Sequence, residues 1–146
     1  MNIAIDSLVE SNKSLDRNKV ELYNYFKKEI AKHRADGYIS LAEVEEKEGS
    51  NRYLRSAQNL YYKANEIYSK YQKNYRNSYS KYESAKYKAD LNDAEDNYNK
   101  GITEYRNAGS SKAKYRAANY YFKEAQKYVY NYKDTNKLLN ETKEKG

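Results

Sequence analysis

The chain has 146 residues, with 28 Lys and Arg against 21 Asp and Glu, so its formal net charge is +7. It contains no cysteine, which excludes disulfides, zinc–thiolate sites and thiol catalysis. Tyrosine occurs 20 times and phenylalanine twice. A tyrosine ring can be buried while its hydroxyl stays in water, which suits thin helical layers. The length predicts a single domain, residues 1–146, with one elongated core.

The net charge is unevenly distributed. Residues 1–50 carry 8 Lys/Arg against 10 Asp/Glu, a balance of −2, and residues 51–146 carry 20 against 11, a balance of +9. A basic body of this kind attracts polyanions or acidic protein surfaces, although a solvated helix surface has the same composition.

No segment approaches the length of a membrane-spanning helix, and the first ten residues lack the basic start and apolar run of a signal peptide. We therefore expect a soluble chain, which is either cytoplasmic or the mature part of an exported protein.

Residues 1–50 predict two helices after a first dozen residues without a firm pattern. The first helix ends at Gly37, and a short second helix begins at a capping box headed by Ser40 and ends at Gly49. The first helix has an apolar face, formed by Val20, Tyr23, Phe26 and Ile30. We expect both helices to pack on the element that follows.

Residues 51–89 carry a heptad ladder of small residues and tyrosines. Its members are Ala57, Tyr61, Ala64, Tyr68, Tyr71, Tyr75, Ser78, Tyr82, Ala85 and Ala89. This spacing predicts one continuous helix about 57 Å long. The alternative is a break within residues 74–78, which would give shorter hairpins. Residues 90–93 read Asp-Leu-Asn-Asp, so we expect the chain to turn back there.

The rest of the chain predicts two helices at residues 94–107 and 112–131, separated by a stop-and-cap signal at residues 109–111. A short helix carrying Leu138 and Leu139 follows a turn. The predicted fold class is therefore all-α, an elongated antiparallel bundle or helical-hairpin array with one long helix over about residues 51–89.

A unit made of a small residue, an aromatic residue four positions later and a second small residue three positions after that occurs four times. The units are Ala57/Tyr61/Ala64, Ser78/Tyr82/Ala85, Ala94/Tyr98/Gly101 and Ala118/Phe122/Ala125. The last one, within Ala-Asn-Tyr-Tyr-Phe-Lys-Glu-Ala, resembles the second helix of a tetratricopeptide repeat, and residues 94–101 are similar to the first helix of that family.

The resemblance covers residues 94–130 and implies a helical hairpin whose surface binds protein segments. The sequence departs from the family in its longer loop around Gly109, in lacking the terminal proline and in showing no regular repeat period. Heptad packing would produce the same spacing.

Catalytic chemistry has little support in the sequence. His33 is the only histidine and no cysteine accompanies it, so a metal site or a nucleophile–base pair is not expected. The carboxylate pairs lie in polar helix ends, without the apolar pocket that raises the pKa of one member. We expect no enzyme, no catalytic residue, no cofactor and no metal.

Two binding functions remain. One is a protein-interaction or scaffold module with a basic, tyrosine-rich helical surface. The other is binding of single-stranded nucleic acid or another polyanion, which needs exposed rings beside cations. Most tyrosines of the chain lie on helix faces that are expected to be buried, so the scaffold is favoured, and a homo-oligomer stays open. The candidate contact residues are Tyr62, Tyr79, Tyr87, Tyr120, Tyr130, Lys123 and Lys127.

Overall fold

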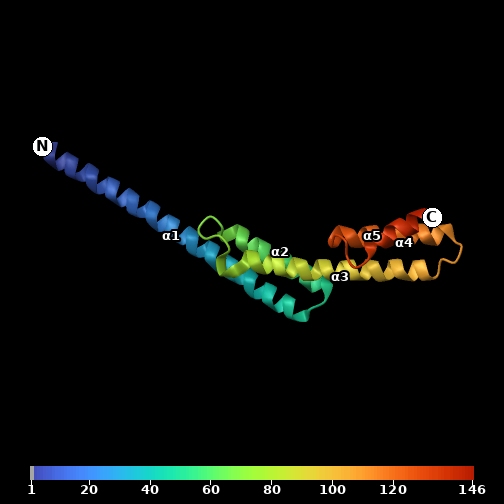
Figure 1. The fold of residues 1–146 in the computed structure, drawn as a ribbon. Coiled ribbons are helices and arrows are strands. Elements are labelled where there is room, and N and C mark those ends of the chain that lie inside the picture. Colours follow the sequence, from blue (N-terminus) through green and yellow to red (C-terminus); the bar gives the residue numbers. More distant parts are fainter. Residues whose placement is uncertain (1) are drawn as a thin grey trace.

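The protein is all-α and elongated, as the computed structural model of residues 2–146 shows (Figure 1); side chains are described from residue 5 onward. The helices are α1 (Asn2–Glu48), α2 (Asn51–Tyr68), α3 (Ser78–Arg106), α4 (Lys112–Tyr128) and α5 (Thr135–Lys145), with a 3₁₀ turn, η1 (Tyr75–Asn77), before α3. Each helix packs against the next along the chain, and the residues described contain no strand. The predicted fold class is confirmed.

Helix α3 belongs to two three-helix lobes that follow one another along its length (Figure 1). The N-lobe consists of the last third of α1, α2 and the first half of α3. Its buried core is Ala35, Ile39, Ala42, Ala57, Tyr61, Ala64, Tyr68, Tyr75 and Ala85. The C-lobe consists of the second half of α3, α4 and α5. Its buried core is Ala118, Phe122 and Leu138, against which Tyr98, Ile102, Tyr105 and Leu139 pack.

The small residues of the four repeated units are all buried, as their heptad spacing predicts. These residues are Ala57, Ala64, Ser78, Ala85, Ala94, Gly101, Ala118 and Ala125. Small side chains allow the backbones of neighbouring helices to approach closely, so the tyrosine and phenylalanine rings can lie across the contact. The cores of the two lobes are thin for this reason.

The predicted continuous helix over residues 51–89 is wrong, and the alternative with a break is confirmed. Helix α2 ends at Tyr68 and α3 begins at Ser78. The intervening loop is fixed by Asn74, whose Oδ1 accepts hydrogen bonds from the backbone N–H groups of Tyr79 at 2.9 Å and Ser80 at 3.1 Å. That side chain therefore caps the first turn of α3.

Three residues of the loop adopt the left-handed backbone conformation. Asn74, Arg76 and Asn77 have φ angles of 53°, 49° and 60°. The backbone N–H of Asn74 donates to Oδ1 of Asn65 at 3.1 Å, which ties the loop back to α2. Asparagine tolerates this region better than most residues, so Asn74 and Asn77 are suited to end one helix and start another.

The predicted turn at residues 90–93 is also wrong, because α3 continues through them. Their carboxylates bind α2 instead of capping a helix. Nη2 of Arg55 donates to Oδ1 of Asp90 at 2.8 Å and to Oδ2 of Asp93 at 2.6 Å, and Asn51 donates to Asp93 at 2.7 Å. The guanidinium of Arg55 also lies 5.8 Å from the ring centre of Tyr128 at the end of α4, so it joins the two lobes.

Helix α1 does not stop at Gly37, as the sequence predicted, and it contains no second short helix. It runs unbroken to Glu48 and ends at Gly49, because a φ of +81° is incompatible with a right-handed helix. A Cβ added at Gly37 would meet no atom within 4 Å, so this glycine serves neither a turn nor a close contact within the chain.

The first part of α1 projects away from both lobes (Figure 1). We call residues 5–30 the arm, since every side chain in this range is exposed. The apolar face predicted to pack on the long helix is free instead. Val20, Tyr23, Phe26 and Ile30 are 58%, 63%, 53% and 60% exposed. Among the helices of residues 2–146, none is both long and apolar enough to cross a membrane.

Candidate functional site

The outward side of α4 is basic and carries three of the predicted contact residues, Tyr120, Lys123 and Lys127. Ala118, Phe122 and Ala125 turn inward and are fully buried. At 100° per residue, the opposite side of the helix carries an exposed row of side chains. This row, which we call the α4 face, consists of Arg116, Tyr120, Lys123 and Lys127.

Positive charge dominates this helix. Residues 112–128 contain five Lys or Arg and one acid, Glu124. Nζ of Lys127 donates to Oε1 of Glu124 at 2.6 Å, and this hydrogen bond raises the pKa of the lysine. Arg116 and Lys123 form no ion pair within 4.0 Å inside residues 5–146. Their charges are therefore available to an acidic ligand.

Two exposed tyrosines accompany these cations. Tyr120 is 58% exposed, and its ring centre lies 5.5 Å from that of Tyr121 in an edge-to-face arrangement. Tyr130 follows the end of α4 and is 81% exposed, the largest exposed fraction among the large hydrophobic side chains of the described residues. These rings offer apolar area that a partner could bury beside the lysines.

The remaining predicted contact residues lie elsewhere. Tyr62 of α2 and Tyr79 of α3 both stack near Tyr82, with ring centres 5.2 Å and 5.6 Å from it. Tyr79 also lines a hollow of about 360 Å³ beside the α2–α3 loop. Tyr87 is 63% exposed on the outer side of α3. The predicted residues therefore form two groups and one isolated ring, not a single surface.

Inward-facing tyrosines have a structural role that the sequence pattern did not indicate. Their hydroxyls donate hydrogen bonds to carboxylates on other elements. The pairs are Tyr61–Glu46, Tyr75–Asp36, Tyr98–Asp134, Tyr105–Glu141 and Tyr132–Glu95. Burial raises the pKa of each of Tyr61, Tyr75, Tyr98 and Tyr132, and the hydrogen bond to the carboxylate raises it further. This pairing accounts for tyrosine where phenylalanine would fill the same space.

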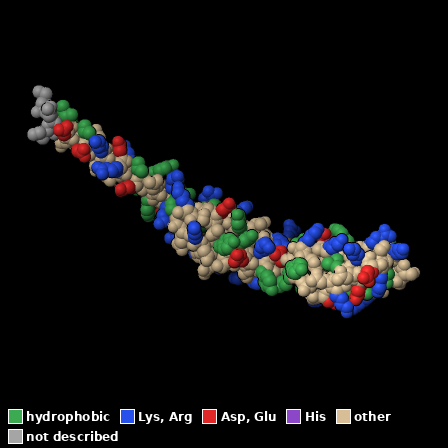
Figure 2. Space-filling view, turned by 45° about the horizontal axis from the view of Figure 1, so that its top comes forward, with side chains coloured by type: hydrophobic (Ala, Val, Ile, Leu, Met, Phe, Trp, Pro, Cys, Tyr) green, Lys and Arg blue, Asp and Glu red, His purple; other side chains and the backbone are tan. Residues whose placement is uncertain are grey.

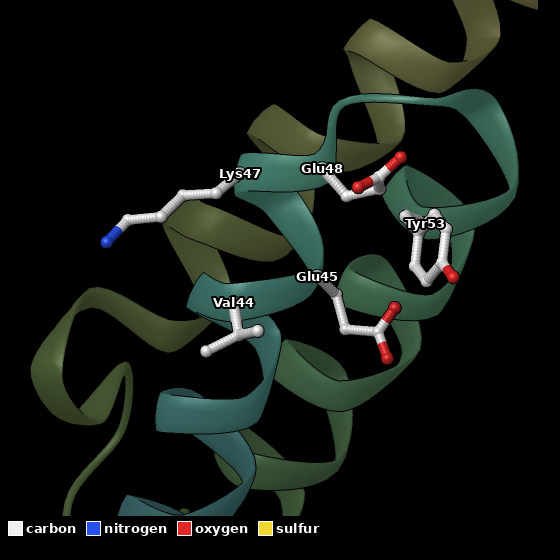
Figure 3. Close-up of a pocket in the computed structure, with 5 residues that line it drawn as sticks. All are labelled: Val44, Glu45, Lys47, Glu48 and Tyr53. Carbon is white, nitrogen blue, oxygen red and sulfur yellow. The ribbon is translucent and has the colours of Figure 1, made fainter.

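A shallow hollow of about 470 Å³ lies at the turn between α1 and α2 (Figure 3). The carboxylate of Glu45 and the ring of Tyr53 extend toward the same space, and Val44, Lys47 and Glu48 complete the lining. One carboxylate oxygen of Glu45 is buried without a hydrogen-bond partner. These groups can accept hydrogen bonds from a cation, but no nucleophile–base pair lines the hollow.

Charged side chains of both signs are scattered along the surface seen in Figure 2, over the arm and over both lobes. Within residues 5–146, no group of three or more His, Asp or Glu side chains is placed to hold a metal ion. The absence of an enzymatic activity stays a prediction.

Comparison with known proteins gives no relative: no family model, no curated protein and no solved structure matches this chain. The second half of α3 and α4 do form a helical hairpin, in which Phe122 packs over Gly101. Many helical proteins contain such a hairpin, so the tetratricopeptide resemblance stays a prediction.

Proposed function

We propose that this protein is a non-catalytic interaction module that binds an acidic segment of a partner protein through the α4 face. The observation that carries the proposal is the combination of unpaired Arg116 and Lys123 with the exposed ring of Tyr120 on one side of a single helix. Arginine and tyrosine are among the side chains that dominate binding energy at protein interfaces.

The rigid support of this face favours recognition over a merely solvated surface. Phe122 is fully buried against α3, and Ser111 caps the start of α4 by accepting a hydrogen bond from the N–H of Lys114. The backbone that carries the exposed row is therefore fixed, and less conformational entropy is lost on binding.

Binding of single-stranded nucleic acid is the second candidate, favoured by the exposed ring of Tyr120 on the same side of α4 as Lys123 and Lys127. Rings of this kind stack on bases, and lysines neutralise phosphates. Glu124, however, already pairs with Lys127 on this helix. A nucleic-acid groove needs a longer line of free cations, so protein recognition is the stronger proposal.

The test is a pull-down from the source cells at several salt concentrations with the intact chain and three variants. Tyr120→Ala and Lys123→Glu should each weaken capture of the same partner by about tenfold, because both remove contacts from the α4 face. Tyr87→Ala is the matched control, since it removes a ring of similar exposure from α3, 63% against 58% for Tyr120. Circular dichroism should be unchanged in all three variants.

The result that overturns the proposal is equal binding of the partner by the chain and by both α4 variants. Fluorescence anisotropy with a labelled oligothymidine serves as the second arm. Strong, sequence-indifferent binding whose affinity falls steeply with salt would replace the proposal with the nucleic-acid function.

A further inference from the structure

The arm is a long helix without tertiary support. Every side chain of residues 5–30 is exposed, and from residue 5 onward Ala31 is the first in α1 to be even partly buried. The arm spans roughly 39 Å at 1.5 Å per residue. Helices in water owe most of their stability to the packing of an apolar face, and the arm packs its face on nothing within the described chain.

The apolar side chains of the arm form a seam with coiled-coil spacing. Leucine recurs every seven residues at Leu8, Leu15 and Leu22, which are 65%, 57% and 55% exposed. Other residues fall midway between or beyond the leucines, so the spacing alternates between three and four. We call the whole set the seam; it consists of Ile5, Leu8, Asn12, Leu15, Lys19, Leu22 and Phe26. Alternating spacing of this kind is typical of helices that pair side by side.

The seam faces away from the N-lobe. The side of α1 that packs on the N-lobe is marked by Ala35, Ile39 and Ala42, all fully buried. At 100° per residue, the seam lies about 180° around the helix from these three residues. Leu41 and Val44 continue the seam side beyond the arm and are 49% and 65% exposed. A second helix can therefore lie along the seam without meeting the N-lobe.

Charge along the arm is compatible with pairing of identical chains. The positions on either side of the seam carry almost no charge; they are Val9, Ser11, Asp16, Asn18, Tyr23, Tyr25 and Ile30. Most charged residues of the arm point outward instead, and they include both signs. Two copies would therefore not bring rows of like charge together. A lipid-binding helix would instead concentrate Lys and Arg on its polar side.

We propose that two copies of this chain pair through their seams as a parallel, in-register coiled coil. Leucine at one seam position of each heptad is typical of parallel dimers, and Asn12, one of the two polar residues of the seam, specifies register by facing its counterpart in the second copy. The long stem of Lys19 packs along the seam while its ammonium reaches water. Both N-lobes then lie on the outer sides of the pair, at the same end.

The first experiment is sedimentation equilibrium of the full chain with two matched variants. Leu15 and Val20 are equally exposed, at 57% and 58%, but only Leu15 belongs to the seam. The natural chain should sediment as a dimer. Leu15→Lys should raise its dissociation constant at least about a hundredfold, because it removes two buried leucines and brings two ammonium groups together. Val20→Lys should leave the dissociation constant unchanged.

The second experiment tests the parallel register by disulfide cross-linking. The chain has no cysteine, so single-cysteine variants give unambiguous bonds. Leu8→Cys should form a disulfide between copies under mild oxidation, because in-register pairing brings the two residues together. Glu10→Cys points outward and should not.

Three results would overturn the proposal. One is a natural chain that stays at its monomer mass of 17.3 kDa, including one that binds anionic vesicles as a monomer. Another is the same dimer dissociation constant for the Leu15→Lys and Val20→Lys variants. The third is a dimer that Leu8→Cys cannot cross-link.

Discussion

The N-lobe core packs three tyrosine rings among five alanines, whereas the C-lobe core is centred on Phe122, which lies over Gly101. Both lobes use the same helix, α3, and both bury its small residues. They differ in what fills the space above those residues. In the N-lobe, each of Tyr61 and Tyr75 reaches an acid on α1, so the core is closed by polar contacts at its edge. In the C-lobe, a ring without a hydroxyl sits at the centre.

This difference shows that the distance between the helices and the chemistry of the central ring vary independently. Small residues decide how near the helices come, and the central ring decides whether the middle of the core ends in a hydrogen bond or in packing alone. At the edge of the C-lobe, Tyr98 and Tyr105 still end in hydrogen bonds. Substitutions in the two lobes should therefore differ in a measurable way.

The largest effect is expected from truncating the central ring of each lobe. Tyr61 and Phe122 are the two largest fully buried side chains. Tyr61→Ala and Phe122→Ala should each lower the free energy of unfolding by about 3–5 kcal/mol. Urea denaturation followed by circular dichroism measures both. Tyr61→Phe should lose only about 1 kcal/mol, because the ring remains while the bond to Glu46 is lost. A loss as large as that of Tyr61→Ala would show that the hydroxyl, not the ring, holds the N-lobe.

The next effect concerns the small residues, one in each lobe. Ala64 and Ala118 are fully buried between helices. Ala64→Leu and Ala118→Leu should each destabilise the fold by roughly 1–3 kcal/mol, because the larger side chain forces the helices apart. Thermal melts compare the two variants directly. An unchanged melting temperature in either lobe would mean that its helices do not pack as closely as described.

A third, smaller effect should change sign between two glycines. A Cβ at Gly101 would lie 2.5 Å from Cε1 of Phe122, whereas one at Gly37 would meet nothing within 4 Å. Gly101→Ala should therefore destabilise by about 1–2 kcal/mol through overpacking. Gly37→Ala should stabilise by about 0.5–1 kcal/mol, the ordinary gain inside a helix. Urea midpoints that shift in the same direction for both would contradict the packing of Phe122 over α3.

The smallest effect concerns pH. Burial, together with a hydrogen bond to Asp134, raises the pKa of Tyr98 to about 12, above its usual 10.0. The folded state therefore holds this proton more tightly than the unfolded chain. The stability that results is complete below pH 10 and is lost as the pH rises toward 12. Tyr98→Phe should make melting less sensitive to pH between 10 and 12 and cost about 0.5–1 kcal/mol at pH 7. Melts at pH 7 and pH 11 test this, and an identical pH dependence in both proteins would exclude Tyr98 as the cause.

The sequence predicted burial better than it predicted where helices end. Heptad spacing identified Ala57, Ala64 and Ala85 as core residues because the small residues must meet a neighbour. The same spacing concealed the break after Tyr68. The ladder positions at Tyr75 and Ser78 stay in phase across the loop and are buried, although Tyr75 lies outside α2 and α3.

Residues 90–93 were misread because their partners are distant in sequence. Local rules treat Asp90 and Asp93 as turn residues, whereas Arg55 binds both from another helix. Nothing within a short window of sequence reveals that contact. The free side of the arm was likewise hidden, since an apolar face indicates packing but does not say which chain supplies the partner. The spacing of the aromatic residues predicted that Tyr120 and Tyr130 are exposed. It did not predict that they lie apart from Tyr62 and Tyr79.

The rigidity of α3 sets a minimum length for any ligand that would touch both groups of tyrosines. Tyr79 lies in the first turn of α3. The α4 face lies on the helix whose Phe122 contacts Gly101 of α3, and Gly101 is 22 residues after Tyr79. That distance is about 33 Å at 1.5 Å per residue. An extended peptide covers at most about 3.4 Å per residue, so one of fewer than about ten residues can reach only one group. Short peptides would then compete at one end of the molecule and leave the other free.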